Sequence, residues 1–190
     1  MKKLRNFLIL FVIIVIAINI YQSIQKKDVD GETLYSNADV YNFLDDKWNR
    51  TNVNATATKL NNGSSANTCV YFIAEVLRKN NFNVPNETNN ISQILTFLKA
   101  KGWEKQSNYE ELKLGDICFT TDGDGDKNGV PTHTYIFMKW VEEGNYDYAY
   151  ICDNQAKDYK GKVYHIRNIK VVDKANGYSK DAFAFYMKKI

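Results

Sequence analysis

Residues 64–77 read SSANTCVYFIAEVL, a stretch in which small polar residues give way at Cys69 to the pattern of a buried helix. The apolar side chains after the cysteine follow the spacing of one helix face: Val70, Ile73, Val76 and Leu77. Asn67 or Thr68 is suited to the N-cap, which predicts that Cys69 lies in the first turn of the helix. The thiol is therefore expected at the start of an amphipathic helix.

The position of Cys69 favours chemistry as well as packing. Unpaired N–H groups and the positive end of the helix dipole stabilise an anion in the first turn, so a thiol there loses its proton readily. A free cysteine also packs like a small apolar residue, and the alternative interpretation is an inert thiol in the core. Cys118 and Cys152 lie within predicted strands, and we interpret both as core thiols.

A thiol nucleophile needs a base close to it and a third group that orients the base. His133 begins a predicted strand, and Asp153 follows the next one. If these strands are antiparallel neighbours, the start of one lies beside the end of the other, which predicts that Asp153 reaches the His133 ring. Asn154 is the alternative third residue. His165, on a later strand, is the competing base, although we interpret it as a structural or rim histidine.

The composition is that of one globular domain of ordinary size with a tail. Three cysteines at irregular spacing do not make a disulfide framework, and two distant histidines argue against a zinc site. Residues 1–27 hold five basic side chains and no acidic one, so residues 28–190 carry a net charge of −2 although the whole chain carries +3. The domain has no basic stripe, and we expect no nucleic-acid partner.

The N-terminus has the pattern of a membrane segment. Residues 7–18 are uniformly apolar, follow three basic residues, and are not followed by a good cleavage site. We predict an uncleaved signal anchor over residues 1–24, a polar linker over 25–36 and a domain over 37–190. The basic flank predicts a cytoplasmic start and an extracytoplasmic domain at the cell membrane. The alternative is a cleaved signal peptide and a secreted domain.

Helices are expected first and strands second. Helical spacing predicts helices over 37–48 and 90–101 in addition to the one that begins at Cys69, whereas the Asn- and Thr-rich stretch 50–63 predicts a loop. The predicted strands are 116–120, 133–141, 146–152, 163–166 and 183–187. This order predicts an α+β fold in which helices pack on an antiparallel sheet of about five strands.

The order of these residues resembles that of the papain-like cell-wall hydrolases, namely the NlpC-type and CHAP peptidase or amidase families. The features that carry the resemblance are Cys69 at a helix start, LGDICF at 114–119, His133 on the next strand and DNQ at 153–155. The resemblance covers about residues 61–190, which would form the core of the domain. Thr68 and Val70 differ from the residues that usually flank the nucleophile in these families.

The resemblance implies an active site and a mechanism. Cys69 would be the nucleophile, His133 the base and Asp153 the residue that orients it, with an acyl thioester as intermediate. Further orienting or oxyanion-binding roles would fall to Asn154, Gln155 and Asn67. The implied substrate is an amide bond in the peptides of peptidoglycan, and no cofactor is required for this chemistry.

A second motif lies between two predicted strands. Residues 122–129 read DGDGDKNG, which matches the first half of a calcium-binding loop, with oxygen ligands at alternate positions and a glycine for the turn. The candidate ligands are Asp122, Asp124, Asp126 and Asn128. The twelfth place holds Tyr135 instead of a bidentate glutamate, so the motif is not a complete EF-hand. The alternative is an acidic hairpin turn.

Together these patterns predict a membrane-anchored, extracytoplasmic cysteine peptidase or amidase. Its expected partners are peptidoglycan peptides and, through the N-terminal helix, the cytoplasmic membrane. The alternative is a catalytically inactive domain of the same fold that acts as a cell-wall or calcium-dependent binding module.

Overall fold

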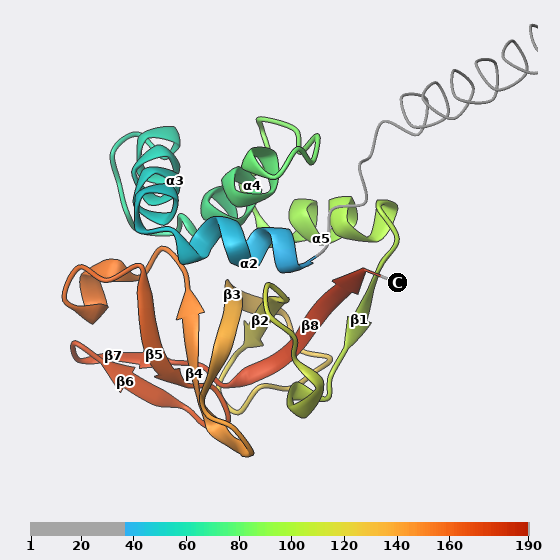
Figure 1. The fold of residues 1–190 in the computed structure, drawn as a ribbon, viewed down its shortest axis with the longest axis vertical. Coiled ribbons are helices and arrows are strands. Elements are labelled where there is room, and N and C mark those ends of the chain that lie inside the picture. Colours follow the sequence, from blue (N-terminus) through green and yellow to red (C-terminus); the bar gives the residue numbers. More distant parts are fainter. Residues whose placement is uncertain (1–36, 190) are drawn as a thin grey trace, which may run out of the picture. The chain divides into compact units, whose positions relative to one another are not determined.

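Helices come first and strands second along residues 37–189, the part of the chain that the computed structural model describes (Figure 1). The α-helices of this part are α2 (Asn37–Asp45), α3 (Lys47–Leu60), α4 (Cys69–Lys79) and α5 (Ile91–Ala100). The strands are β1 (Trp103–Gln106), β2 (Ile117–Thr121), β3 (Pro131–Glu142), β4 (Asn145–Cys152), β5 (Tyr164–Asn168), β6 (Asp173–Ala175), β7 (Tyr178–Lys180) and β8 (Phe183–Lys189). The short 3-10 helices are η1 (Tyr109–Glu111) and η2 (Ala156–Tyr159).

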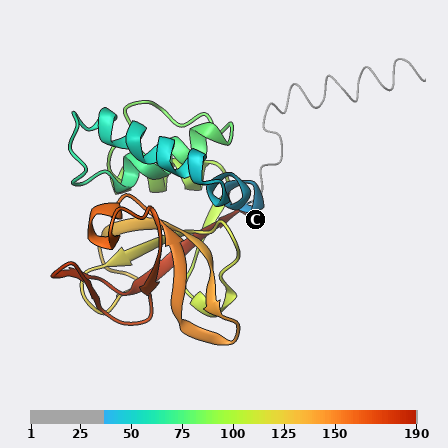
Figure 2. The same cartoon turned by 60° about the vertical axis from the view of Figure 1, so that its left-hand side comes forward.

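Six of the described strands form one sheet in the order β1-β8-β2-β3-β4-β5, and each neighbouring pair is antiparallel. The remaining two, β6 and β7, form a separate antiparallel ribbon. Helices α4 and α5 contact β3, and both views of the ribbon show the four helices gathered on one side of the sheet (Figure 1 and Figure 2). The predicted α+β class, with helices on an antiparallel sheet, is thus confirmed.

The centre of the sheet is buried on both faces. All five residues of β2 are buried, and so are residues 133–138 of β3. One face packs on the helices, of which α4 is the most deeply buried. A second apolar cluster consists of Leu112, Cys118, Tyr135, Phe137, Ala149, Ile151, Ile169, Phe183 and Tyr186. Burial on both sides holds β2, β3 and β4 rigidly, as a precise site requires.

The described part of the chain contains three strands, β1, β6 and β7, that the sequence patterns do not predict. The five predicted strands correspond to β2, β3, β4, β5 and β8. The additional strand of the main sheet, β1, reads WEKQ and buries only Trp103, so it lacks the alternation that identifies a strand. It forms because it pairs with the C-terminal strand, with Trp103 opposite Lys189. The strands β6 and β7 are short and mostly exposed, so their sequences lack the apolar alternation that would predict a strand.

The prediction of a loop over 50–63 is wrong, because α3 occupies most of this stretch. Asp46 caps the helix by accepting the backbone N–H of Asn49 at 2.9 Å, and it separates α3 from α2 where the spacing predicts one helix. Val53 and Ala57 lie one turn apart and are buried beside α4. Two threonine hydroxyls donate to carbonyls four residues earlier, which accommodates polar residues within the helix. Packing therefore overrides weak helix propensity here.

The predicted signal anchor and linker lie outside the described residues. Within residues 37–189, no helix combines the length and the apolar character needed to cross a membrane. The membrane segment therefore stays a prediction from the sequence.

Gly115 joins the two layers at the start of β2. Its N–H donates to Phe137 O at 2.9 Å, and its φ of +85° is the left-handed conformation that glycine adopts freely. A Cβ at this position would lie 1.8 Å from the carbonyl oxygen of Asn37, the first residue of α2. The next residue, Asp116, accepts hydrogen bonds from the Asn37 side chain and, at 2.8 Å, from the N–H of Lys113. Only glycine allows α2 to approach this closely.

We expect Gly115→Ala to lower the free energy of unfolding by about 3 kcal/mol or more, because overpacking adds to the cost of a left-handed alanine. Urea unfolding followed by tryptophan fluorescence measures the loss. Gly144→Ala is the matched control, since Gly144 has a φ of +82° and an added Cβ there would meet no neighbour within 4 Å. The control should lose only about 1–2 kcal/mol, and equal losses would contradict the steric role of Gly115.

Candidate active site

Cys69 opens α4, as the capping pattern predicts, and its side chain is half-buried. A tight turn precedes it, with Asn67 in the left-handed conformation at a φ of +57°. Thr68 occupies the N-cap position, but its side chain makes no capping hydrogen bond to the helix. Its hydroxyl donates to Ser65 O at 3.0 Å instead. The backbone N–H of Val70 is then left to hydrogen-bond the Cys69 sulfur.

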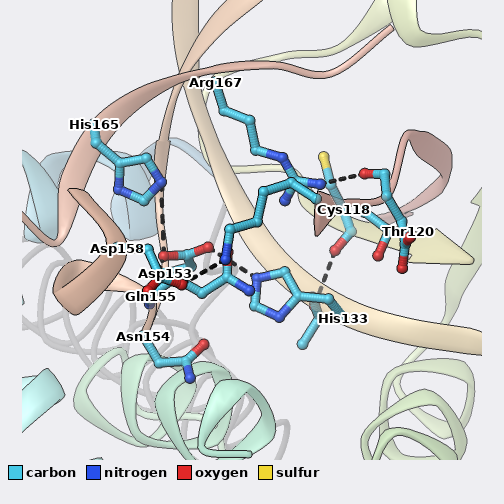
Figure 3. Close-up of polar contacts among 12 residues, drawn as sticks. Cys118, Thr120, His133, Asp153, Asn154, Gln155, Asp158, His165 and Arg167 are labelled. Atoms are coloured by element: carbon cyan, nitrogen blue, oxygen red, sulfur yellow. Dashed lines mark hydrogen bonds and ion pairs between the residues drawn. The ribbon is translucent and has the colours of Figure 1, made fainter. Parts of the chain in front are cut away.

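His133 and Asp153 form the pair that strand geometry predicts (Figure 3). Strands β3 and β4 are antiparallel, with Ile136 opposite Cys152, so the start of β3 lies beside the residue that follows β4. His133 Nε2 donates to Asp153 Oδ2 at 2.8 Å. The other carboxylate oxygen accepts the backbone N–H of Gln155 at 2.8 Å. Because Asp153 is fully buried, these bonds hold its carboxylate and the imidazole in one arrangement.

Cys69 at the start of α4 and His133 on β3 line the same cavity and are close enough to shift each other's pKa. Burial alone would raise the pKa of the Cys69 thiol, but the hydrogen bond and positive charge of His133 outweigh burial and lower that pKa. Burial would lower the pKa of His133, yet its hydrogen bonds to Asp153 and Cys69 raise it to about 9. Both shifts favour the thiolate–imidazolium form of the pair over the neutral thiol and imidazole.

Asp153 keeps its charge within the protein. Burial raises the pKa of its carboxyl, but the hydrogen bond and positive charge of His133, together with the hydrogen bond from the backbone N–H of Gln155, lower that pKa. An ionised carboxylate that accepts a hydrogen bond from an imidazole fixes the tautomer and the orientation of that ring. Asp153 is thus suited to the orienting role.

His165 lies on the opposite side of Asp153 from His133 (Figure 3). Its Nε2 is 3.8 Å from Asp153 Oδ1, and its Nδ1 donates to Lys162 O at 3.1 Å. The ring stacks on Tyr159 with 3.5 Å between centroids. Burial lowers the pKa of His165, so the ring is neutral near pH 7. This position agrees with a structural histidine, and the residue that contacts Cys69 is His133.

The three candidate orienting residues have different positions. Asn154 Nδ2 donates to Thr68 Oγ1 at 2.9 Å, which ties the segment after β4 to the start of α4. Gln155 holds the Asp153 carboxylate through its backbone N–H, while its side chain and that of Asn67 line the cavity beside the sulfur. Asn154 therefore links helix to sheet.

A cavity of about 180 Å³ opens beside Cys69 and His133. Several polar residues that sequence reasoning does not identify also line it: Thr120, Thr132, Arg167, Ser179, Lys180 and Asp181. They come from β2, β3 and β5 of the main sheet, from β7 of the separate ribbon and from the segment before β8, which lie far apart along the chain. The sequence held one indication that Arg167 lies near the site. Arg167 stands two residues after His165, and alternate residues of a strand share a face.

Cys118 and Cys152 are fully buried within the sheet, as the strand patterns predict. Burial raises the pKa of both thiols well above the ordinary value. Neither residue lines the cavity. Of the three cysteines, Cys69 alone therefore combines access with a lowered pKa.

The acidic residues 122–129 form the turn between β2 and β3. Asp126 Oδ1 accepts the N–H of Asn128 at 2.9 Å, and Asp126 O accepts the hydroxyl of Thr121 at 2.9 Å. Asp122 and Asp124 are the other two candidate ligands. Across the described residues, no three His, Cys, Asp or Glu side chains form a group that could hold a metal ion. Calcium binding at this turn stays a prediction from the sequence.

The site therefore contains a thiol of lowered pKa, an imidazole of raised pKa and a buried carboxylate that is hydrogen-bonded to the imidazole. Such a set can attack a carbonyl carbon and protonate the group that leaves. Comparisons of the chain with protein-family models, with curated proteins and with solved structures found no match. The chemistry of the site is thus inferred from the residues of this chain.

We expect iodoacetamide at pH 7 to alkylate Cys69 at least tenfold faster than Cys118 or Cys152, because only Cys69 has an accessible, stabilised thiolate. Peptide mapping by mass spectrometry over a pH series gives the rate at each thiol. As pH falls, the rate at Cys69 should decline at a lower pH than the rate of an ordinary thiol, since its pKa is lowered. Equal rates at the three cysteines would contradict the thiolate–imidazolium pair.

Proposed function

We propose that residues 37–190 form a papain-like cysteine hydrolase that cleaves amide bonds through a thioester. The observation that carries the proposal is that Cys69 and His133 line one cavity, while the His133 ring is hydrogen-bonded at 2.8 Å to the buried Asp153 carboxylate. The order nucleophile, base, orienting carboxylate is the arrangement that activates a thiol for acyl transfer. A polar cavity beside the sulfur gives the substrate access.

The reaction would proceed in two halves. The Cys69 thiolate attacks the amide carbonyl carbon, the carbonyl electrons move to the oxygen, and a tetrahedral intermediate forms. The C–N bond then breaks as His133 gives its proton to the leaving amine, which leaves an acyl thioester on Cys69 and a neutral ring. His133 next takes a proton from water as the water attacks the thioester, and collapse releases the carboxylic acid and restores the thiolate–imidazolium pair.

The proposed substrate is an amide bond in a peptidoglycan peptide. Two arguments support this class: the order of Cys69, LGDICF, His133 and DNQ resembles that of cell-wall hydrolases, and the N-terminal pattern predicts export. A domain tethered outside the cytoplasmic membrane would meet peptidoglycan directly. The proposed enzyme needs no cofactor, since the nucleophile, base and orienting group all come from the chain.

We expect Cys69→Ala to reduce digestion of purified peptidoglycan at least a thousandfold, because the variant has no nucleophile. Mass analysis of the released fragments measures the loss and identifies the bond that is cut. Cys118→Ala and Cys152→Ala are the matched controls, since each removes a buried thiol away from the cavity. Digestion by Cys69→Ala at the rate of the controls would contradict the mechanism, and no digestion by the wild type would favour a binding module.

The pH dependence of kcat/KM should fall on the alkaline side near pH 9, where His133 loses the proton that it must donate. On the acid side, activity should fall as Cys69 gains a proton, at a pH below the ordinary thiol pKa of 9.0. Asp153→Asn removes the hydrogen bond that raises the His133 pKa, so the alkaline limb should move down toward 6.5. An unchanged alkaline limb in Asp153→Asn would show that another group controls it.

A further inference from the structure

Arg167 places a positive charge in the wall of the catalytic cavity. It lies on β5 and is only 2 % exposed, yet it lines the same cavity as Cys69 and His133. Tyr135 lies beneath the guanidinium, with 5.6 Å from Cζ to the ring centroid. Figure 3 shows the side chain extending from β5 toward the polar groups of the site.

The hydrogen-bonding capacity of Arg167 is largely unused within the described protein. Its Nη2 donates to the backbone carbonyl of Asp181. Its Nε and Nη1 are buried and have no hydrogen-bond partner there. Among residues 37–189, no carboxylate forms an ion pair with this guanidinium.

The other charged groups of the cavity are already engaged. Lys180 Nζ pairs with Asp158 Oδ2 at 2.5 Å. The Asp181 carboxylate accepts the hydroxyl of Thr132 at 2.7 Å and the N–H of Gly123 at 3.3 Å. A buried, uncompensated charge costs several kcal/mol. A fork of free N–H donors is the group that binds a carboxylate bidentately, and such pairs are the strongest hydrogen bonds that proteins make.

We propose that Arg167 binds a carboxylate of the substrate, which places a negative charge next to the scissile amide. This inference rests on the proposed function and narrows its substrate to peptides that carry a carboxylate within about one residue of the cleaved bond. The carboxylate has two sources: the C-terminus of the peptide, which makes the enzyme exo-acting, or an acidic side chain within it. In either case a bidentate carboxylate accepts from Nη2 and from one of the two unpartnered nitrogens, Nε or Nη1, which gains its acceptor only when substrate is bound.

The first test compares two alkylating agents at Cys69 in the full-length chain. Iodoacetate carries a carboxylate, and iodoacetamide is its neutral analogue of the same size. The ratio of their rates, measured by mass spectrometry, should fall about tenfold or more in Arg167→Met. Arg78→Met is the matched control, because Arg78 lies on α4 and pairs with Glu75 outside the cavity, and its ratio should equal that of the wild type.

The second test uses the wild-type protein alone, so it does not depend on the folding of a variant. N-acetyl-dialanine should protect Cys69 from iodoacetamide, while its C-terminal amide should not. N-acetyl-glutamyl-alaninamide, whose one carboxylate is on a side chain, tests the second source. Protection by either acid supports the subsite and identifies the source of the carboxylate. Absence of protection by both, with Cys69 still labelled selectively, would overturn the inference.

The two proposals fail in different ways. An unchanged alkylation ratio in Arg167→Met overturns the carboxylate subsite but leaves selective labelling of Cys69 by iodoacetamide intact. Loss of that selectivity, or digestion that survives Cys69→Ala, overturns the hydrolase itself. Arg167→Lys separates charge from shape, because a lysine keeps the charge without the bidentate fork, and its ratio should fall between those of the wild type and Arg167→Met.

Discussion

The hydrogen bond between His133 and Asp153 is the interaction on which the site depends. It raises the pKa of the imidazole, and the protonated ring in turn stabilises the Cys69 thiolate. A fully buried carboxylate is costly unless it is hydrogen-bonded on several sides, and Asp153 meets this need through His133 on one oxygen and the N–H of Gln155 on the other. The register of β3 against β4 brings these groups together, so the reactivity of the thiol follows from sheet geometry.

The site also depends on how the helical layer meets the sheet, because Cys69 lies on α4 and His133 on β3. The hydrogen bond from Asn154 to Thr68 fixes the start of α4 against the segment that follows β4. At the other end of the interface, Gly115 lets α2 approach β2 closely. Asn154, Thr68 and Gly115 therefore matter to the site because they fix the position of the helices against the sheet.

Local signals in the sequence were enough to predict the parts of the site that are close along the chain. The capping pattern and apolar spacing placed Cys69 at a helix start, and antiparallel pairing of consecutive strands placed Asp153 near His133. Features that depend on pairing between distant parts of the chain could not be predicted in this way. Strand β1 forms only against the C-terminal strand, and Arg167 reaches the cavity only through the pairing of β5 with β4. Helix α3 was missed because two buried apolar residues outweigh its polar composition.

The last described strand occupies an interior place in the sheet, between β1 and β2. A chain that emerges from the ribosome N-terminus first therefore carries its thiol and its imidazole long before β8 can insert. Lys180 and Asp181, which line the cavity, come just ahead of that strand and arrive almost as late. The order of synthesis thus delays assembly of the site. A nascent or C-terminally shortened chain contains Cys69 and His133 but lacks the strand that completes the sheet around them.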